Sequence, residues 1–196
     1  MGKFNKYIFS INESIILLNI FIFFLGNILA KFNYIYQYDF ILFNINSEYY
    51  QNHQWFTYMF LHSNIYHLFF NMLLLYIFGE SVEKYFGRLK YLLFYLICGV
   101  VSIISYSIIE YDFVAVLGAS GALFGVTMVY ALINKDLKIY NFFSIPIKVN
   151  YLIFLYIINE FLLSFDNYDN IAHTAHVSGS VIGLIMYFSF KKGAPS

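Results

Sequence analysis

Two short polar motifs interrupt apolar stretches of this 196-residue sequence. Residues 118–121 read Gly-Ala-Ser-Gly and open a short apolar segment, and residues 172–176 read Ala-His-Thr-Ala-His and open the last one. A polar or ionisable side chain inside a membrane segment is costly, and it is by default a candidate functional residue. A hydroxyl and an imidazole are the groups that hydrolysis by a nucleophile and its general base requires. Ser120 and His176 therefore predict serine-based hydrolysis, provided that the fold brings the two motifs together.

The composition is that of a membrane protein. Hydrophobic residues make up 61% of the chain, aromatic residues 23% and charged residues only 11%, whereas a soluble domain carries about 25% charged residues. The class indicated is an all-α polytopic membrane protein. A net charge of zero gives no argument for a nucleic-acid partner. A single cysteine, Cys98, excludes an internal disulfide and a cysteine-based metal cluster.

Six apolar segments approach the length of about 20 residues that a membrane-spanning helix needs. We therefore expect one membrane domain over 1–196, with six helices and no linker or repeat. The first segment is interpreted as a retained helix, because no small-residue cleavage site follows it. The segment from 31 to 60 is too polar to span and rich in Tyr, Phe and Asn, which favours a place in the outer interface. The expected helices cover 14–30, 61–78, 91–109, 120–133, 149–165 and 171–190.

Basic residues give the predicted helices an orientation. In a six-helix arrangement ten of the 11 Lys and Arg residues fall on one side, and only Lys31 falls on the other. The positive-inside rule then predicts that both termini face the cytoplasm. The ten are Lys3, Lys6, Lys84, Arg88, Lys90, Lys135, Lys138, Lys148, Lys191 and Lys192. The opposite loops instead carry Asp39, Glu48, Glu110, Asp112, Asp166 and Asp169.

The helix that starts at Ser120 looks too short to span. Its fourteen residues reach only about 21 Å, against a hydrocarbon core of about 30 Å. The preceding chain is therefore expected to dip into the membrane, which non-helical backbone does only where protein or a water-filled cavity surrounds it. Ser120 would lie at the bottom of such a cavity, level with His67 and His176, whose helices also enter from the outer side.

Two further sets of residues fit around Ser120. His67 and Asn71 are four apart, so they share a helix face, and both can donate hydrogen bonds to an oxyanion. The free N–H groups at the start of the helix at Ser120 add to these donors. The alternative role for His67 and Asn71 is to hold helices together.

Small residues at helical spacing predict that two helices approach closely. Gly121 and Gly125 are four apart on one segment, and Ala175, Gly179 and Gly183 are four apart on the last. Packing alone would explain one such stripe. Two stripes that each begin beside a reactive side chain favour packing together with positioning of that side chain.

Together these pieces resemble the rhomboid intramembrane serine proteases. The matching stretches are 62–72, 78–83, 118–121 and 175–179 with Gly183, in the order in which the family has them. The resemblance implies a minimal bacterial six-helix form in the inner membrane. Its implied activity is that of a serine endopeptidase that cleaves transmembrane segments of membrane-protein substrates near the outer face of the lipid bilayer.

The resemblance also implies roles for single residues. Ser120 would be the nucleophile and His176 its base, in a dyad without an acidic third member. His67, Asn71 and the backbone N–H of Ser120 would form the oxyanion hole. The resemblance implies no metal and no cofactor. Supporting positions in this reading are Gly118, Gly121, Phe124 and Gly179, with Phe124 packed against the imidazole, and Glu83 and Gly87 at the cytoplasmic end of the second helix.

Two features depart from the family pattern or stay open. The family usually has Trp-Arg in its first outer loop, where this sequence has His53-Gln54. That pair is structural, so the change puts the rigidity of the loop in question more than the chemistry. Glu160, inside the fifth predicted helix, has three roles open to it: reaching to the interface, pairing with a neighbour, or facing the route of the substrate.

Three other functions were weighed against the protease. A catalytically inactive rhomboid-like protein would bind membrane proteins without cutting them, but such proteins typically lack Ser120 or His176. A transporter would show broken helices in paired halves, and no such symmetry is visible. A zinc protease lacks its His-Glu-x-x-His motif here, and two of its conceivable ligands, His62 and His67, are five apart and so lie on different faces of a helix. The conceivable ligands would be His62, His67, His173 and His176.

Overall fold

The computed structural model describes residues 9–31, 37–110, 112, 114–140, 144, 146–165 and 171–191. Its long helices are α1 (Ile11–Ala30), α4 (Ile65–Phe86), α5 (Arg88–Ile109), α6 (Ser120–Ile133), α7 (Val149–Leu163) and α8 (His173–Lys191). The shorter elements are α2 (Gln37–Phe40), β1 (Leu42–Phe43), α3 (Gln54–Thr57), the 3₁₀ turn η1 (Tyr58–Phe60), β2 (Ala115–Val116), β3 (Lys138–Tyr140) and β4 (Pro146–Lys148). Of the charged residues used for orientation, five lie outside the described residues: Lys3, Lys6, Asp166, Asp169 and Lys192.

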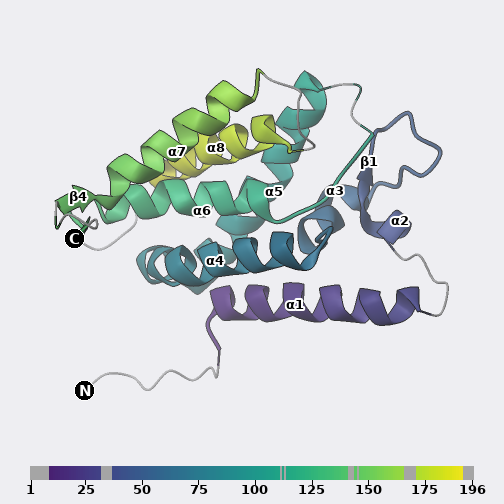
Figure 1. The fold of residues 1–196 in the computed structure, drawn as a ribbon, viewed down its shortest axis with the longest axis horizontal. Helices are drawn as coiled ribbons and strands as arrows, with labels where there is room; N and C mark the ends of the chain where they lie inside the picture. Colours follow the sequence, from purple (N-terminus) through teal and green to yellow (C-terminus); the bar gives the residue numbers. More distant parts are fainter. Residues whose placement is uncertain are drawn as a thin grey trace.

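Helix α6 is the centre of the bundle. It contacts α4, α5, α7 and α8, and residues 121–129 are all buried. Helix α1 lies at one edge and packs on α4, while α7 and α8 lie on the other side of α6 (Figure 1). A helix that is apolar all round belongs in such a position, because only a complete ring of neighbours can cover it.

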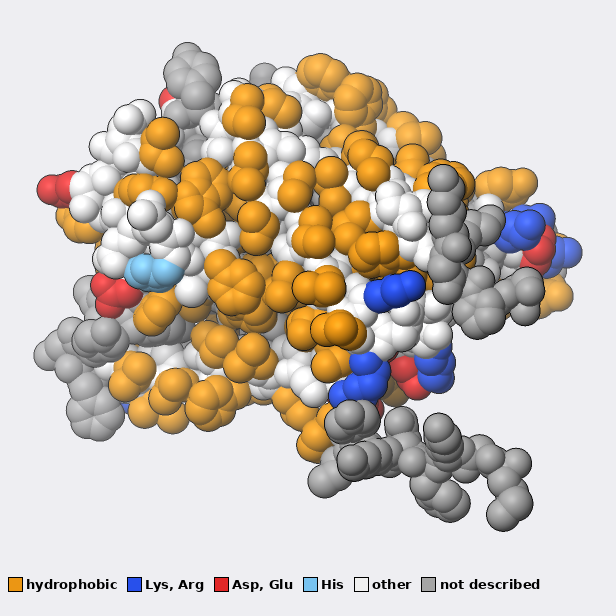
Figure 2. Space-filling model, turned by 180° about the vertical axis from the view of Figure 1, so that it is seen from behind, with side chains coloured by type: hydrophobic (Ala, Val, Ile, Leu, Met, Phe, Trp, Pro, Cys, Tyr) orange, Lys and Arg blue, Asp and Glu red, His pale blue; other side chains and the backbone are white. Residues whose placement is uncertain are grey.

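The outside of the bundle is apolar, as a bilayer requires. Large side chains such as Phe21, Leu155 and Phe188 are more than half exposed, and Figure 2 shows hydrophobic side chains across the middle of one face. By length and apolarity α1, α4 and α5 can each cross a membrane, and α6 and α7 are shorter apolar helices. The chain is therefore an all-α polytopic membrane protein, as its composition predicted.

Lys and Arg gather at one end of this bundle (Figure 2). The α4–α5 connection, next to Lys84 and Arg88, and the α6–α7 connection, with Lys138 and Lys148, lie at one end of the bundle in Figure 1. The two connections lie on the same side, which is the arrangement on which the prediction of a cytoplasmic face depends.

Local signals explain why the boundaries of two helices, α4 and α1, differ from the predicted ranges. Helix α4 begins at Ile65 rather than at residue 61, because the Asn64 side chain accepts the N–H of His67 and caps the helix. It continues eight residues past position 78 and ends at Gly87, whose φ of 81° favours glycine. Helix α1 begins at Ile11 instead of residue 14, after Ser10 forms a capping box with Glu13. Helix α8 begins at His173, two residues after the predicted start.

Glu83, near the end of α4, fastens the first helix of the bundle. Its carboxylate accepts the backbone N–H groups of Ile11 (3.0 Å) and Asn12 (2.8 Å). A helix start leaves these donors unsatisfied, and an anion there also meets the positive end of the helix dipole. The buried Asn12 continues the link by donating to the carbonyl of Leu75 and accepting from the hydroxyl of Tyr91.

Gln54 organises the outer segment that precedes α4. The side chain is fully buried; its Oε1 accepts from the N–H groups of Phe43 and Gln51, and its Nε2 donates to the carbonyls of Tyr38 and Tyr49. One neutral amide thus satisfies four backbone groups, which a buried loop requires. The segment is therefore built around Gln54. Where the family usually has Trp-Arg, this chain has His53-Gln54, and the polar atoms of the Gln54 side chain are all hydrogen-bonded.

The outer segment is also tied to the loop that carries the serine. Strand β1 pairs antiparallel with β2, with Leu42 opposite Val116 and Phe43 opposite Ala115. Two residues beyond β2, the N–H of Gly118 donates to the carbonyl of Tyr58 over 3.0 Å. These contacts hold the loop that leads to Ser120, so the described part of the outer segment, residues 37–60, has specific contacts with the bundle.

Candidate active site

Ser120 is the first residue of α6, at the end of a glycine-bearing loop. Gly118 has a φ of 129°, a conformation that side chains other than glycine rarely adopt. A Cβ at Gly118 would also lie 2.9 Å from Cε1 and Nε2 of His67. The glycine therefore serves two needs at once: it turns the chain into α6, and it lets the imidazole of His67 approach the backbone beside Ser120.

The two glycine-bearing stripes bring α8 directly onto α6. A Cβ at Gly179 would overlap the carbonyl oxygen of Gly121, and a Cβ at Gly183 would lie 2.6 Å from the carbonyl oxygen of Gly125. Only glycine permits such backbone contact. As a result Ser120 Oγ and His176 Nε2 are 2.8 Å apart, within the reach of a nucleophile and its base.

His176 is held on its other side by two neighbours. Its Nδ1 lies 2.6 Å from Glu160 Oε2. Phe124, one turn after Ser120, stacks on the imidazole with ring centroids 4.3 Å apart and an interplanar angle of 11°. The ring therefore has one nitrogen toward the serine, one toward a carboxylate, and a face covered by an aromatic ring.

Glu160 has a definite place in the structure. It is buried on α7, and the oxygen that meets His176 also lies 2.7 Å from His173 Nδ1. Of the three roles open from the sequence, pairing with a neighbour is the one observed. The signal for this pair was present: an acid inside an apolar helix needs donors, and His173 lies one turn before His176 on the same helix.

His67 and Asn71 face the same region from α4. The hydroxyl of Ser63 is 3.1 Å from His67 Nδ1, and a hydroxyl that donates there leaves the ring proton on Nε2, the atom beside Gly118. Asn71 Nδ2 donates to His62 Nε2 over 3.0 Å, which fixes the amide and leaves its second N–H for another acceptor. From the sequence, His62 had no predicted role apart from that of a ligand in the zinc alternative.

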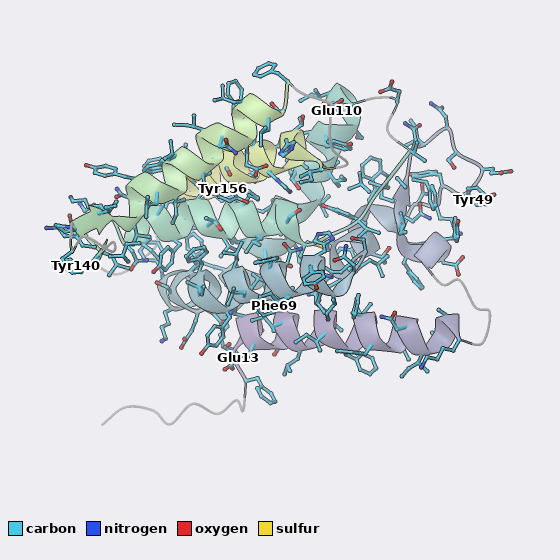
Figure 3. The ribbon with its side chains drawn as sticks, in the orientation of Figure 1. Glu13, Tyr49, Phe69, Glu110, Tyr140 and Tyr156 are labelled. Atoms are coloured by element: carbon cyan, nitrogen blue, oxygen red, sulfur yellow. The ribbon has the colours of Figure 1, made fainter. Side chains whose placement is uncertain are left out.

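These groups surround one water-accessible space. A cavity of about 910 Å³ reaches Ser120 and is lined by the residues of both motifs and by polar side chains from α4 and α5. Glu110, at the end of α5 (Figure 3), contributes a carboxylate to the wall and accepts from Thr174 over 3.2 Å. The polar lining includes Asn64, His67, Asn71, Ser120, His173 and His176.

Glu160, His173 and His176 are also the set of described residues that could hold a metal ion, with ligand atoms within 4.8 Å of one another. Two ligands of one tetrahedral zinc ion lie about 3.3 Å apart. The carboxylate oxygen is 2.6 and 2.7 Å from the two nitrogens, which is the spacing of hydrogen bonds rather than of shared metal ligands. His62 and His67, the other residues of the zinc alternative, do not belong to this set.

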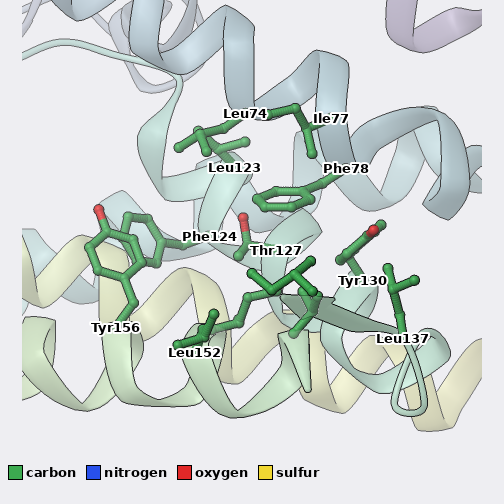
Figure 4. Close-up of a pocket in the computed structure, with 13 residues that line it drawn as sticks. Leu74, Ile77, Phe78, Leu123, Phe124, Thr127, Tyr130, Leu137, Leu152 and Tyr156 are labelled. Carbon is green, nitrogen blue, oxygen red and sulfur yellow. The ribbon is translucent and has the colours of Figure 1, made fainter. Parts of the chain in front are cut away.

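A second, apolar hollow lies beside the polar cavity, between α4 and α7. Its volume is about 360 Å³, and Figure 4 shows Leu74, Ile77 and Phe78 of α4 on one side and Leu152 and Tyr156 of α7 on the other. Helix α6 forms its floor with Leu123, Phe124 and Thr127. We call this hollow the α4–α7 groove. Tyr156 also lines the polar cavity and stacks on Phe124, so the groove leads to the site.

The family model described as the Rhomboid domain matches residues 49–192. Rhomboid-like protein 11, chloroplastic, of Arabidopsis thaliana is 28% identical over 149 residues, which cover 71% of this chain and 53% of that protein. Rhomboid protease GluP of Bacillus subtilis is 35% identical over 120 residues, 61% of this chain and 23% of that protein. Putative rhomboid protease YdcA of the same species is 32% identical over 132 residues, which cover 65% of this chain and 62% of that protein. The chain thus spans between about a quarter and three fifths of the lengths of these relatives.

Proposed function

Because the chain belongs to the rhomboid family, we propose that it is an intramembrane serine endopeptidase in which Ser120 attacks and His176 acts as the base. The observation that carries this proposal is the 2.8 Å contact between Ser120 Oγ and His176 Nε2 at the wall of a polar cavity. Two of the similar proteins, GluP and YdcA, are named rhomboid proteases, which supports the same reaction class.

The reaction follows from this geometry. Ser120 Oγ attacks the carbonyl carbon of a peptide bond while its proton passes to His176 Nε2. The oxyanion that forms is within the region of the N–H of Ser120, His67 Nε2 and the amide of Asn71. The tetrahedral intermediate then breaks its C–N bond, and His176 returns the proton to the leaving amine. Water from the cavity hydrolyses the ester with the same base.

The α4–α7 groove supports a membrane-protein substrate. Its walls and floor are almost entirely apolar, with Thr127 as the polar exception apart from two tyrosine hydroxyls. A substrate helix in the bilayer can therefore lie against α4 and α7 without losing lipid-like contact. The chain next to Ser120 must be extended for attack, so a substrate segment that unwinds readily should be preferred.

In this proposal the protein acts as a multi-pass protein of a bacterial inner membrane, and residues 1–196 form one rhomboid-like unit. Both termini face the cytoplasm, and the polar cavity opens to the outer side. The basic connections α4–α5 and α6–α7 support that orientation. Transmembrane proteins are the proposed substrates.

The test is cleavage of a generic transmembrane reporter by the purified protein in detergent. Ser120→Ala should abolish cleavage while the protein stays folded, because alanine fits the tight start of α6. A fluorophosphonate probe should label the wild type at Ser120 and leave the variant unlabelled. A folded wild type that neither cleaves nor reacts with the probe would instead identify an inactive rhomboid-like binding protein.

A further inference from the structure

We propose that Glu160 is a positioning residue for the reaction: its carboxylate holds His176 in the tautomer that can accept the proton of Ser120, and His173 holds the carboxylate. This inference rests on the proposed protease function and adds an acidic member to the Ser–His pair. It stands on one oxygen, Glu160 Oε2, which lies 2.6 Å from His176 Nδ1 and 2.7 Å from His173 Nδ1.

The first step of the argument concerns the proton on His176. A neutral imidazole carries its proton on one nitrogen and accepts with the other. An ionised carboxylate at Nδ1 can only accept, so it keeps the proton there and leaves the lone pair of Nε2 toward Ser120 Oγ at 2.8 Å. A protonated carboxyl would donate to Nδ1 and put the ring proton on Nε2, where it blocks the transfer from serine.

The second step concerns charge during the reaction. When the serine proton reaches Nε2, His176 becomes a cation on a side chain that is largely buried in the helix bundle. The carboxylate of Glu160, in contact with the opposite nitrogen, offsets that charge where electrostatic interactions are strong. Phe124 covers one face of the ring and supplies no such charge.

The third step explains how the carboxylate keeps its place. Glu160 is 5% exposed, and a buried anion is tolerated only with hydrogen-bond donors. His173 supplies a donor besides His176, from one turn earlier on α8. Because both donors meet the same oxygen, rotation of Glu160 away from His176 would break two contacts. Glu160 and Ile153 are the buried residues of α7, so this contact also sets how α7 sits on α8.

The experiment compares Glu160→Gln with Glu80→Gln in steady-state cleavage and in the rate of Ser120 labelling by a fluorophosphonate. Both changes remove a carboxylate from a helix of the bundle, but Glu80 is exposed on α4 and pairs with Lys84 outside the polar cavity. Glu160→Gln should lower kcat by about 100-fold or more with little change in KM, as expected when an orienting carboxylate is lost. Its labelling rate should fall in parallel. Glu80→Gln should stay near wild type.

Two more variants separate positioning from simple packing. Glu160→Asp should recover part of kcat because it restores the charge. His173→Gln should lose less than Glu160→Gln, since it leaves the contact with His176. If Glu160→Gln does not fold, ¹⁵N-histidine NMR of the wild type still tests the proposal: His176 should carry its proton on Nδ1, and a proton on Nε2 would overturn it.

The outcomes also keep the two proposals apart. If the wild type cleaves, Ser120→Ala does not, and Glu160→Gln keeps the wild-type kcat and labelling rate, the role of Glu160 is refuted and the protease stands. The role of Glu160 is also refuted if Glu160→Gln changes only KM and keeps the wild-type kcat and labelling rate. If the wild type itself neither cleaves nor labels, the proposed function fails first.

Discussion

Helix α6 has two very different sides. Toward α8 the backbones touch, with Gly179 and Gly183 against the carbonyls of Gly121 and Gly125. Between α4 and α7 the same helix is the floor of the α4–α7 groove, an apolar hollow of about 360 Å³. The first region fixes two side chains to within a hydrogen bond, and the second leaves space for another chain. One side of α6 therefore holds two side chains in a fixed geometry, while another side borders an open groove.

The contrast follows from residue size. At Gly121, Gly125, Gly179 and Gly183 no side chain separates α6 from α8, so the two backbones touch there and can move no closer. Across the groove, α4 and α7 carry bulky residues such as Leu74, Phe78 and Leu152, which keep the helices apart without filling the gap. Catalytic precision and access are thus assigned to different faces of α6.

Disrupting the close contact between α6 and α8 should have the largest effect on cleavage. Gly179→Ala places a Cβ against the carbonyl oxygen of Gly121, where no side chain can yield. Overpacking of this kind costs about 3 kcal/mol, and separation of α8 from α6 also moves His176 from Ser120. We expect cleavage to fall by more than about 100-fold, since each 1.4 kcal/mol is worth tenfold, together with a lower unfolding temperature in detergent. Val181→Leu, on an exposed position of α8, is the control and should behave as wild type.

The next largest effect on cleavage should come from removing a hydrogen-bond donor of α4 that faces the polar cavity. Asn71→Ala removes an amide proposed to bind the oxyanion, and loss of one such donor costs about 100- to 1,000-fold in kcat. KM should change little, because the interaction forms in the transition state. Asn27→Ala on α1, where the exposed amide donates to the carbonyl of Phe23 on its own helix, is the matched control. An effect of Asn71→Ala on KM alone would assign this residue to substrate docking.

Narrowing the groove should have a smaller and more selective effect. Leu152→Trp adds bulk to the groove wall, so kcat/KM for a transmembrane substrate should fall by about tenfold, which corresponds to about 1.4 kcal/mol. Labelling of Ser120 by a small fluorophosphonate should not change, because the polar cavity stays open. Leu155→Trp, 64% exposed on the same helix, tests whether bulk on α7 matters outside the groove. Equal losses in both variants would argue against a substrate route through the groove.

The smallest effect on activity is expected from variants that only report which side the site faces. Ser47→Cys lies in the outer segment and Lys138→Cys in β3 at the basic end. An impermeant thiol reagent added outside intact cells should label Ser47→Cys and not Lys138→Cys, and both should cleave normally. The native Cys98 is buried and should stay silent. The reverse labelling pattern would turn the mouth of the cavity toward the cytoplasm.

The sequence anticipated the meeting of Ser120 and His176, because the stripes of small residues beside them predict which helices touch. It did not reveal the partner of Glu160, since that contact depends on how α7 rotates against α8, and α7 has no periodic pattern to fix its rotation. The extension of α4 to Phe86 was missed because hydropathy falls at Glu80 and Glu83, although the helix continues to Gly87. The role of Gln54 arises from contacts with four separate backbone positions, which no local pattern encodes.

The chain order of the Ser–His pair has a consequence for biosynthesis. The imidazole of His176 comes 56 residues after the hydroxyl of Ser120, and Glu160 comes between them. At translation rates of about 5 to 20 residues per second, the serine exists for about 3 to 11 s before its base has been made. If the proposed pair is the catalytic one, the nascent protein can during that interval neither cut itself nor damage the other chains leaving the insertion machinery.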